Sequence, residues 1–371
     1  MTANGSSPRG NNPSGRVTIS GLAQRLGISK ASVSYALNAQ PGVSAQTRVR
    51  VLALADELGW YASSSARALS HSRSDAVGIV LARSPEQVGS ESFYMSVLAG
   101  IESVLSEHEM NVMLRMVDPR EGSPVANGQG LRERGDLAVY RRWAGERRVD
   151  GVIIFDHFAN DPRPQLLAKL ALPHVLVGAG ADVDPGPFGA SVTVDQEGDA
   201  GTLVEALHSL GHRHIAYICG PSELTHEVAR RAGMLHHAQI LGMSMVFSAS
   251  DYTADDGGKA TTAVVAGLAP GSPDFPTAVV YGNDLMAVGG LLALKRLGIS
   301  VPEQVSVLSW DDSLLCQLSS PTVTALRRDT MELGRRSATL LLATVGGHRS
   351  ANTCMPAAVL QRRNSLSKAA N

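Results

Sequence analysis

Residues 29–38 read SKASVSYALN, a stretch that has the features of a short helix. Ser29 is a typical N-cap residue, because its side-chain oxygen can accept a hydrogen bond from a free backbone N–H of the first turn. Small and apolar residues follow it at helical spacing, with Lys30 in the first turn and Tyr35 one turn later. The stretch therefore predicts a helix that presents small and polar side chains outward.

A second short helix is predicted just before it, at residues 18–26, where three apolar residues share one helical face. Gly27 follows, and glycine can adopt the left-handed conformation that ends a helix. Two helices joined by a three-residue turn with glycine form a helix-turn-helix. We therefore predict that residues 30–38 are a DNA recognition helix.

Ser44 is expected to cap a third helix that runs to about residue 58. Four of its side chains are expected to close a small core against the first two helices: Val49, Leu52, Ala53 and Leu58. Three helices with local contacts can form a small domain. We place this domain at residues 16–61, after a polar, Gly- and Pro-rich tail at residues 1–15 that is expected to be disordered.

Charge is distributed unevenly over the 371 residues. Residues 1–74 carry eight arginines or lysines and two acidic residues, a net charge of +6, whereas the rest of the chain carries −7 of the total of −1. A basic head on an acidic body suits a polyanion that meets only one end of the molecule.

The bulk composition, with 44% hydrophobic and 18% charged residues, is that of a globular protein of two or three domains. Its three cysteines (Cys219, Cys316 and Cys354) are too few and too scattered for a disulfide framework or a zinc site. The N-terminal residues lack the apolar core of a signal peptide, and no stretch reaches the ~18 apolar residues of a membrane span. We expect a cytoplasmic protein with no metal, no cofactor and no membrane association.

Residues 62–70 read ASSSARALS, a helix-compatible stretch that is too short to be stable alone in water. We expect residues 62–74 to form a linker that becomes helical only when another molecule holds it. Leu69 stands out here, because it is an apolar side chain on a segment without a core of its own.

From residue 76 onward, apolar runs typical of buried strands alternate with helical patterns. Examples are VGIVL (77–81), DGVIIF (150–155), HIAYICG (214–220) and TAVVYG (277–282). This alternation predicts an α/β body of parallel sheets that helices cover on both faces. Two successive series predict two doubly wound lobes with a ligand crevice between them. Lobe 1 is expected at about residues 75–188 and 328–355, and lobe 2 at about residues 189–327 and 356–371.

Together these segments resemble the LacI/GalR family of bacterial transcriptional regulators, over residues 17–363. In the first domain the resemblance rests on VTISGLAQRLGISKASVSYALN (17–38), VSAQTRVRVLALADELGW (43–60) and SSARAL (64–69). In the body it rests on FYMSVLAGIE (93–102), RRVDGVIIF (147–155), LGHRHIAYICGP (210–221), YGNDLMAVGGLLALKRLGISVPEQVSVLSWDD (281–312) and TALRRDTMELGRRSATLLL (324–342). It implies an all-α helix-turn-helix headpiece on a two-lobed, periplasmic-binding-protein-like body.

The resemblance also implies a homodimer, or a tetramer, that places one headpiece on each half-site of a pseudo-palindromic operator in double-stranded DNA. By position, the base-reading residues are Lys30, Ala31 and Tyr35, where Tyr35 replaces a frequent arginine. Residues suited to phosphate contacts are Thr18, Ser29, Ser32, Ser34 and Asn38. Leu69 matches the leucine that family members insert into the minor groove at the operator centre.

A small polar effector, a sugar or a related metabolite, is implied in the cleft between the lobes. The matching positions are Phe93, Tyr94, Arg230, Tyr252, Asn283, Asp311 and Arg328. Planar polar groups can bind vicinal hydroxyls in pairs, and aromatic rings can cover the apolar face of a sugar. Gly178 stands where many members have an aspartate, so a sugar, a nucleoside or another polar metabolite all stay open.

The function that follows is a transcriptional regulator, expected to be a repressor, which associates with the nucleoid when bound to its operator. The effector would control operator affinity allosterically, and either release or promotion of DNA binding is open. A transport-type binding protein is disfavoured by the basic head and the lack of a signal peptide. An enzyme is not expected, because the sequence has no G-x-S-x-G, G-x-x-x-x-G-K-[ST] or H-E-x-x-H motif.

Overall fold

The computed structural model describes residues 17–61, 73–118, 122–124, 132–180, 183–348 and 352–370. The chain divides into two compact units, Met1–Ser72 and Arg73–Asn371, here called the headpiece and the body. The predicted tail at residues 1–15, and Leu69 with most of the predicted linker, lie outside the described residues.

The described headpiece consists of three helices, α1 (Ile19–Leu26), α2 (Lys30–Leu37) and α3 (Ala45–Glu57). Each begins at a hydroxyl cap, since the side chains of Thr18, Ser29 and Ser44 accept hydrogen bonds from backbone N–H groups three residues later. Gly27 ends α1 with φ at +65°, in the left-handed region that favours glycine. The predicted helix-turn-helix is therefore present.

The headpiece core lies between the three helices and consists of Leu22, Ala23, Val33, Ala36, Val51 and Ala55. Leu58 packs against it as predicted, but the prediction for Val49, Leu52 and Ala53 was wrong: Val49 and Leu52 are 66% and 47% exposed, and Ala53 is exposed as well. Helix α3 has apolar residues on more than one face. Only the face of Val51 and Ala55, one turn apart, meets α1 and α2.

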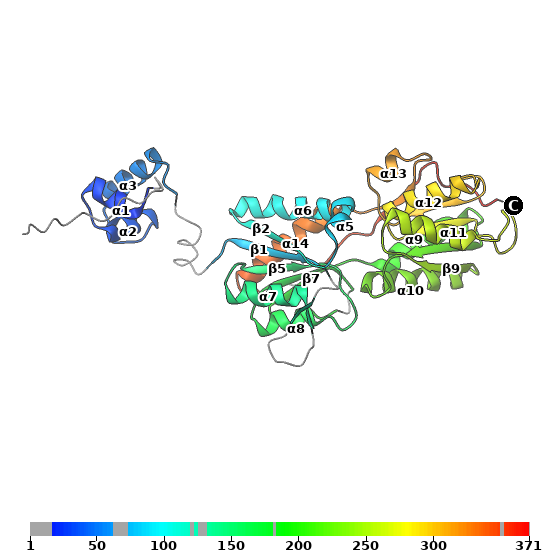
Figure 1. The fold of residues 1–371 in the computed structure, drawn as a ribbon, viewed down its shortest axis with the longest axis horizontal. Coiled ribbons are helices and arrows are strands. Elements are labelled where there is room, and N and C mark those ends of the chain that lie inside the picture. Colours follow the sequence, from blue (N-terminus) through cyan, green and yellow to red (C-terminus); the bar gives the residue numbers. More distant parts are fainter. Residues whose placement is uncertain are drawn as a thin grey trace, which may run out of the picture. The chain divides into compact units, whose positions relative to one another are not determined.

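Lobe 1 of the body is a six-stranded parallel sheet in the order β13-β7-β6-β5-β1-β2 (Figure 1). Its strands are β1 (Ala76–Leu81), β2 (Asn111–Met116), β5 (Gly151–Ile154), β6 (His174–Ala179), β7 (Gly189–Thr193) and β13 (Thr353–Cys354). Helices α5 (Pro85–Ser90), α6 (Ser92–Leu105) and α14 (Thr330–Val345) belong to one side, and α7 (Gly135–Gly145) and α8 (Pro162–Lys169) to the other. A short 3₁₀ helix, η1 (Ser106–His108), follows α6, and β3 (Gly122–Pro124) pairs with β4 (Arg132–Arg134).

Lobe 2 has a second six-stranded sheet in the order β14-β12-β11-β10-β8-β9, in which only the pairing of β12 with β14 is antiparallel. Its strands are β8 (His214–Cys219), β9 (Ser244–Ala249), β10 (Ala278–Tyr281), β11 (Ser306–Ser309), β12 (Thr324–Arg327) and β14 (Val359–Gln361). Its helices are α9 (Gln196–Ser209), α10 (Thr225–Ile240), α11 (Ala254–Val265), α12 (Asp284–Arg296) and α13 (Leu314–Leu318). Separate apolar cores fill the two faces of each sheet, which gives the predicted doubly wound architecture.

The chain crosses between the lobes three times: from β7 to α9, from β12 to α14 and from β13 to β14. Because residues 189–193 pair with β6 in the first sheet, the first crossing lies after residue 193 rather than at residue 188, the boundary predicted from the sequence. Residues of all three crossings border the ligand crevice: Gln196, Arg328 and Ala358.

Glycines bring α6 and α14 together in lobe 1. A Cβ at Gly100 would lie 2.0 Å from the carbonyl oxygen of Met331, and one at Gly334 would lie 2.1 Å from that of Val97. The two helix backbones therefore touch where only glycine fits. This packing fixes the first turn of α14, which borders the crevice.

Candidate nucleic-acid interface and ligand cleft

The exposed face of α2 carries the predicted base-reading residues. Val33 and Ala36 are buried on the opposite face, whereas Lys30 and Ala31 are exposed and Tyr35 is 41% exposed. Tyr35 lies against the turn after α2, because a Cβ at Gly42 would be 3.1 Å from its ring. The exposed part of helix α2 thus carries a cation, a methyl group and a phenol.

The predicted phosphate contacts surround this face, and most of their polar groups already make local hydrogen bonds. The Ser29 oxygen accepts from the N–H of Ser32, and the two hydroxyl groups are 2.9 Å apart. The Asn38 amide donates to the carbonyl oxygen of Ser34 at 3.0 Å. A capping hydroxyl accepts through its oxygen and keeps its own O–H as a donor, so Thr18 can still bind a phosphate oxygen. Of the Ser29 and Ser32 hydroxyl groups, one donates to the other, and the second keeps its O–H for a phosphate.

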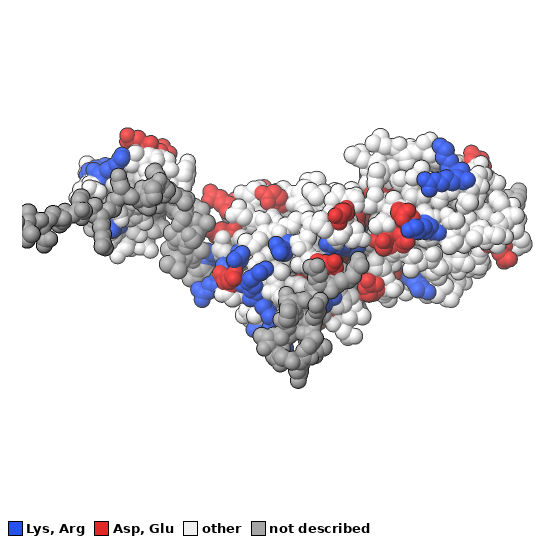
Figure 2. Space-filling model, in the orientation of Figure 1, with Lys and Arg blue, Asp and Glu red and all other residues white. Residues whose placement is uncertain are grey.

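The described headpiece has few acidic side chains, and all of them belong to α3. Its described acidic residues are Asp56 and Glu57 at the end of α3, and Figure 2 shows red at that edge of the unit. Lys30, by contrast, lies in the first turn of α2. No acidic side chain of the described headpiece belongs to α1 or α2, so the recognition face does not repel a phosphate backbone.

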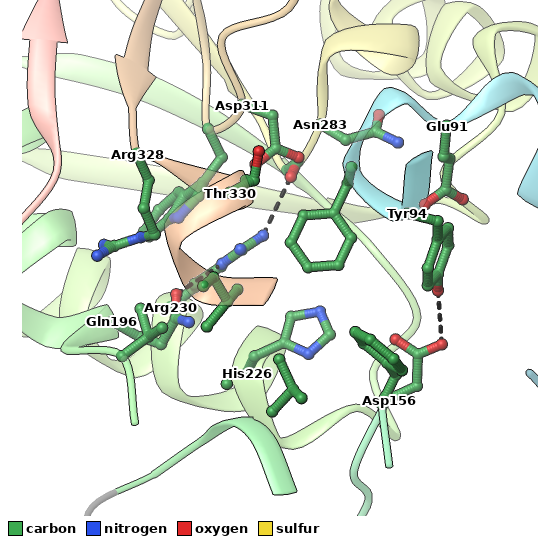
Figure 3. A pocket seen from close by; sticks show the side chains of 18 of the residues that line it. Glu91, Tyr94, Asp156, Gln196, His226, Arg230, Asn283, Asp311, Arg328 and Thr330 are labelled. Carbon is green, nitrogen blue, oxygen red and sulfur yellow. Dashed lines mark hydrogen bonds between the residues drawn. The ribbon is translucent and has the colours of Figure 1, made fainter. Parts of the chain in front are cut away.

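A cleft of about 850 Å³, including its mouth, lies between the lobes of the body. Its walls are the carboxyl ends of parallel strands and the helix starts that follow them, the usual ligand position in such sheets. All seven effector positions predicted from the resemblance line this one cleft: Phe93, Tyr94, Arg230, Tyr252, Asn283, Asp311 and Arg328. Figure 3 shows how the polar members converge.

Arg230 on α10 is the central cation of the lobe 2 wall. Its Nε donates to Gln196 at 2.9 Å, and its Nη1 donates to Glu227 at 3.0 Å and to the carbonyl oxygen of Gly282 at 3.1 Å. Its guanidinium carbon lies 4.6 Å from the centre of the Trp310 ring. Burial by itself would lower the pKa of Arg230, but Glu227, together with Tyr252, Tyr217 and Asp311, raises it above the usual value, so the guanidinium stays charged.

Glu227 lies behind Arg230 and is 2% exposed. It accepts hydrogen bonds from the hydroxyl groups of Tyr252 at 2.6 Å and Tyr217 at 2.8 Å. Burial opposes ionisation, yet Arg230 and these hydroxyls hold the pKa of Glu227 below its usual value. This buried pair fixes both the Arg230 fork and the Tyr252 ring in place.

The lobe 1 wall has its own buried network around Asp156, which follows β5. Tyr94 donates to this carboxylate at 2.6 Å and the Nε of Arg83 donates at 3.0 Å. Burial alone would raise the pKa of Asp156, but Arg83 and Tyr94 lower it well below its usual range. Phe93 packs edge-on against Tyr94 with ring centres 5.5 Å apart, which adds an apolar surface beside the polar one.

Two of the predicted positions have most of their polar groups engaged by the protein. Asn283 caps α12 by accepting from the N–H of Met286 at 2.9 Å, and its amide donates to the carbonyl oxygen of Tyr252 at 3.0 Å. Arg328 forms an ion pair with Asp199 and donates to the carbonyl oxygen of Pro356 at 2.5 Å. Asp199 also accepts from the N–H of Ala358 at 3.1 Å.

Asp311, by contrast, points its carboxylate toward the cleft. No described residue donates a hydrogen bond to this carboxylate. Burial raises its pKa to about 7, against the opposing effect of Arg230. His226 lies nearby and stays neutral, because burial and Arg230 lower its pKa to about 4. A ligand with hydrogen-bond donors would satisfy Asp311.

Several cleft residues were missed by the sequence analysis: Arg83, Glu91, Asp156, Gln196, His226 and Trp310. Asp156 directly follows the predicted strand at residues 150–155, so its place at a carboxyl end could have identified it. Glu91 lies between two helices and has no such signal. Gly178 lines the cleft with φ at +73°, which a side chain would adopt only with strain.

Within the described ranges, no cluster of three or more His, Cys, Asp or Glu side chains is arranged to hold a metal ion. Among the same residues, no helix combines the length and apolar character needed to cross a bilayer.

Comparisons with known proteins agree with this geometry. A family model described as "Bacterial regulatory proteins, lacI family" matches residues 18–63, and one described as "Periplasmic binding protein-like domain" matches residues 204–366. The HTH-type transcriptional regulator CelR of Thermobifida fusca is 30% identical over 335 residues, which cover 90% of this chain and 93% of that protein. The chain belongs to the LacI family. It is therefore a DNA-binding transcriptional regulator and not an enzyme.

Solved structures of LacI-family proteins share the fold. A transcriptional regulator CelR–cellobiose complex matches with a TM-score of 0.67 and 26% identity, covering 95% of this chain and 100% of that one. The lac repressor dimer bound to operator and the anti-inducer ONPF matches with a TM-score of 0.78 and 23% identity, covering 94% and 99%. The latter similarity concerns the fold alone.

Proposed function

We propose that this LacI-family protein is a repressor that binds a pseudo-palindromic operator as a dimer and is controlled by a small polar effector in the interlobe cleft. The observation that carries the proposal is the cleft itself, in which polar and aromatic side chains of both lobes converge. A ligand that touches both lobes changes the free energy of their closure.

At the operator, Lys30, Ala31 and Tyr35 would read bases in the major groove. Lys30 can donate to guanine O6 and N7, and the Ala31 methyl can contact thymine. Thr18, Ser29, Ser32, Ser34 and Asn38 would position α2 through phosphates, which fix register without specifying sequence. Leu69, outside the described residues, would insert into the minor groove from a hinge at residues 62–74.

The effector would lie between the Phe93–Tyr94 wall and Arg230, with Tyr252, Asn283, Asp311 and Arg328 around it. Asp311 and the unused N–H groups of Arg230 suit vicinal hydroxyls, and the aromatic rings suit a sugar face. A saccharide is therefore the favoured class, in line with the cellobiose named for one similar structure. Release and promotion of DNA binding are alternatives that a titration distinguishes.

Dimerisation is supported by apolar side chains on α12 and α13 that no described residue covers. Leu318 is 80% exposed, Leu314 is 68% exposed and Leu292 is 50% exposed. Such neighbouring apolar residues are typical of a homodimer interface, and two-fold symmetry matches a pseudo-palindrome. We place the protein in the cytoplasm, at the nucleoid when it is bound to DNA; a tetramer is a second possible assembly.

A thermal-shift screen of sugars and nucleosides, followed by a DNA-binding titration on the region upstream of the protein's own operon, tests the proposal. We expect one compound to raise the melting temperature and to change operator affinity about 5- to 150-fold. Salt-independent or absent DNA binding would contradict the operator assignment. A stabilising compound whose effect survives substitution of both Tyr94 and Asp311 would contradict the cleft assignment.

A further inference from the structure

The cations that line the cleft are all matched by carboxylates of the protein. Arg83 pairs with Asp156 at 3.0 Å, Arg230 pairs with Glu227 at 3.0 Å, and Arg328 pairs with Asp199. His226 adds no charge, because burial and Arg230 lower its pKa to about 4. The described cleft therefore offers no uncommitted positive charge to a ligand.

Two further carboxyl groups line the cleft, one on each lobe, and neither belongs to these three ion pairs. Glu91 precedes α6, is 9% exposed, and has an Oε1 atom with no hydrogen-bond partner; its nearest cation atom is the Nη1 of Arg83 at 3.9 Å. Asp311 follows β11 in lobe 2. Both line the cleft and both are labelled in Figure 3. With all groups ionised, the negative charges in and directly behind the cleft outnumber the positive ones.

We propose that Glu91 and Asp311 make the cleft a filter for ligand charge, which admits uncharged molecules rich in hydrogen-bond donors and excludes carboxylate- and phosphate-bearing ones. This inference rests on the proposed function and specifies the class of effector. The two groups approach the ligand from opposite lobes, so both act on it when the lobes are closed.

The electrostatics of the two groups support this reading. Burial raises the pKa of Glu91 to about 8, partly offset by Arg83 and increased by Asp156, Asp311 and Asp284. The empty cleft thus already disfavours the negative charge of its own Glu91, and an anionic ligand would meet the same unfavourable environment. An anion would have to share Arg83 with Asp156, or Arg230 with Glu227, and each of these carboxylates already balances the charge of its arginine.

The test uses matched ligands on the full-length protein, measured by isothermal titration calorimetry. Each neutral compound is paired with acidic counterparts: glucose with glucuronate and glucose 6-phosphate, and cellobiose with cellobiouronic acid. We expect the acidic member of a binding pair to bind at least tenfold more weakly than the neutral one. At pH 9, where Glu91 and Asp311 of the wild-type protein are both ionised, the Glu91→Gln, Asp311→Asn double variant should show a severalfold smaller difference, because the excess negative charge is gone.

Glu102→Gln, an exposed carboxylate on α6, is the matched control and should leave the difference unchanged. An acidic compound that binds wild-type protein as tightly as its neutral partner would overturn the charge filter alone. The charge filter would also be overturned if the double variant kept the full difference in affinity between neutral and acidic ligands. Binding by no member of either set would count against the effector cleft as a whole, and so against the proposed function.

Discussion

The guanidinium carbon of Arg83 lies 5.2 Å from the centre of the Tyr252 ring, so a cation of lobe 1 stacks on an aromatic side chain of lobe 2. Two hydrogen bonds accompany this contact across the cleft, from Ser92 to Asp284 at 3.2 Å and from Gln87 to the carbonyl oxygen of Asp251 at 3.3 Å. These contacts stabilise the closed arrangement of the lobes.

Arg83→Lys should weaken lobe closure, because lysine keeps the charge beside Asp156 but stacks less well on Tyr252. A cation–π contact contributes about 0.5–2 kcal/mol, so effector affinity should fall about 2- to 30-fold. Calorimetry would measure the affinity, and small-angle scattering of ligand-free protein should show a larger radius of gyration. Unchanged values in both measurements, equal to those of an Arg142→Lys surface control, would contradict this role.

Arg230→Ala should abolish effector binding and also destabilise the body, because it leaves Glu227 buried without a cation. Breaking a buried pair in this way costs about 3–5 kcal/mol, so thermal unfolding should shift by roughly 10 °C. The double variant Arg230→Ala, Glu227→Gln should recover much of the stability but none of the binding. Recovered binding in the double variant would show that Arg230 only supports the fold.

Stability should depend on pH through Glu91. Its folded pKa of about 8 exceeds the ordinary value of 4.5, so the folded state holds a proton that the unfolded state releases. The stabilising effect is complete below pH 4.5 and is lost as the pH rises toward 8. Glu91→Gln should therefore raise the melting temperature relative to wild type more at pH 8 than at pH 5. An equal increase at both values would mean that Glu91 does not titrate in this window.

Lys30→Ala should relax the sequence preference of the headpiece, because Lys30 is the exposed cation of the recognition face. Losing a base contact costs about 1–3 kcal/mol on the preferred operator and little on unrelated DNA. Fluorescence anisotropy with operator and scrambled duplexes would measure both. An equal loss on the two duplexes, with a shallower salt dependence, would instead identify a phosphate contact.

Much of the fold could be predicted because a buried parallel strand is an uninterrupted apolar run, as in β1 and β10. The strand β9 lacks this signal, since it forms a sheet edge and several of its residues are exposed. In α3, the apolar residues Val49 and Leu52 led to a wrong prediction of which helix face is buried in the core. Only the packing partners of the helix decide which of two apolar stripes is buried.

The cleft was predictable in part for a related reason. Arg230 and Asp311 occupy positions that match a family pattern, and the structure brings them to one site. Glu91 could not be identified from the sequence, because its importance comes from the lack of a hydrogen-bond partner for one oxygen. That property arises only when loops distant in the chain are brought together.

Asp199 accepts from both Arg328 and the N–H of Ala358, so one carboxylate ties together the three chain segments that join the lobes. Three connections tied at a common point resist stretching and twisting far more than they resist bending. The softest motion of the body is then a hinge rotation that changes the angle between the two lobes. In the proposed mechanism, an effector that binds between the lobes would act on the body by changing that angle.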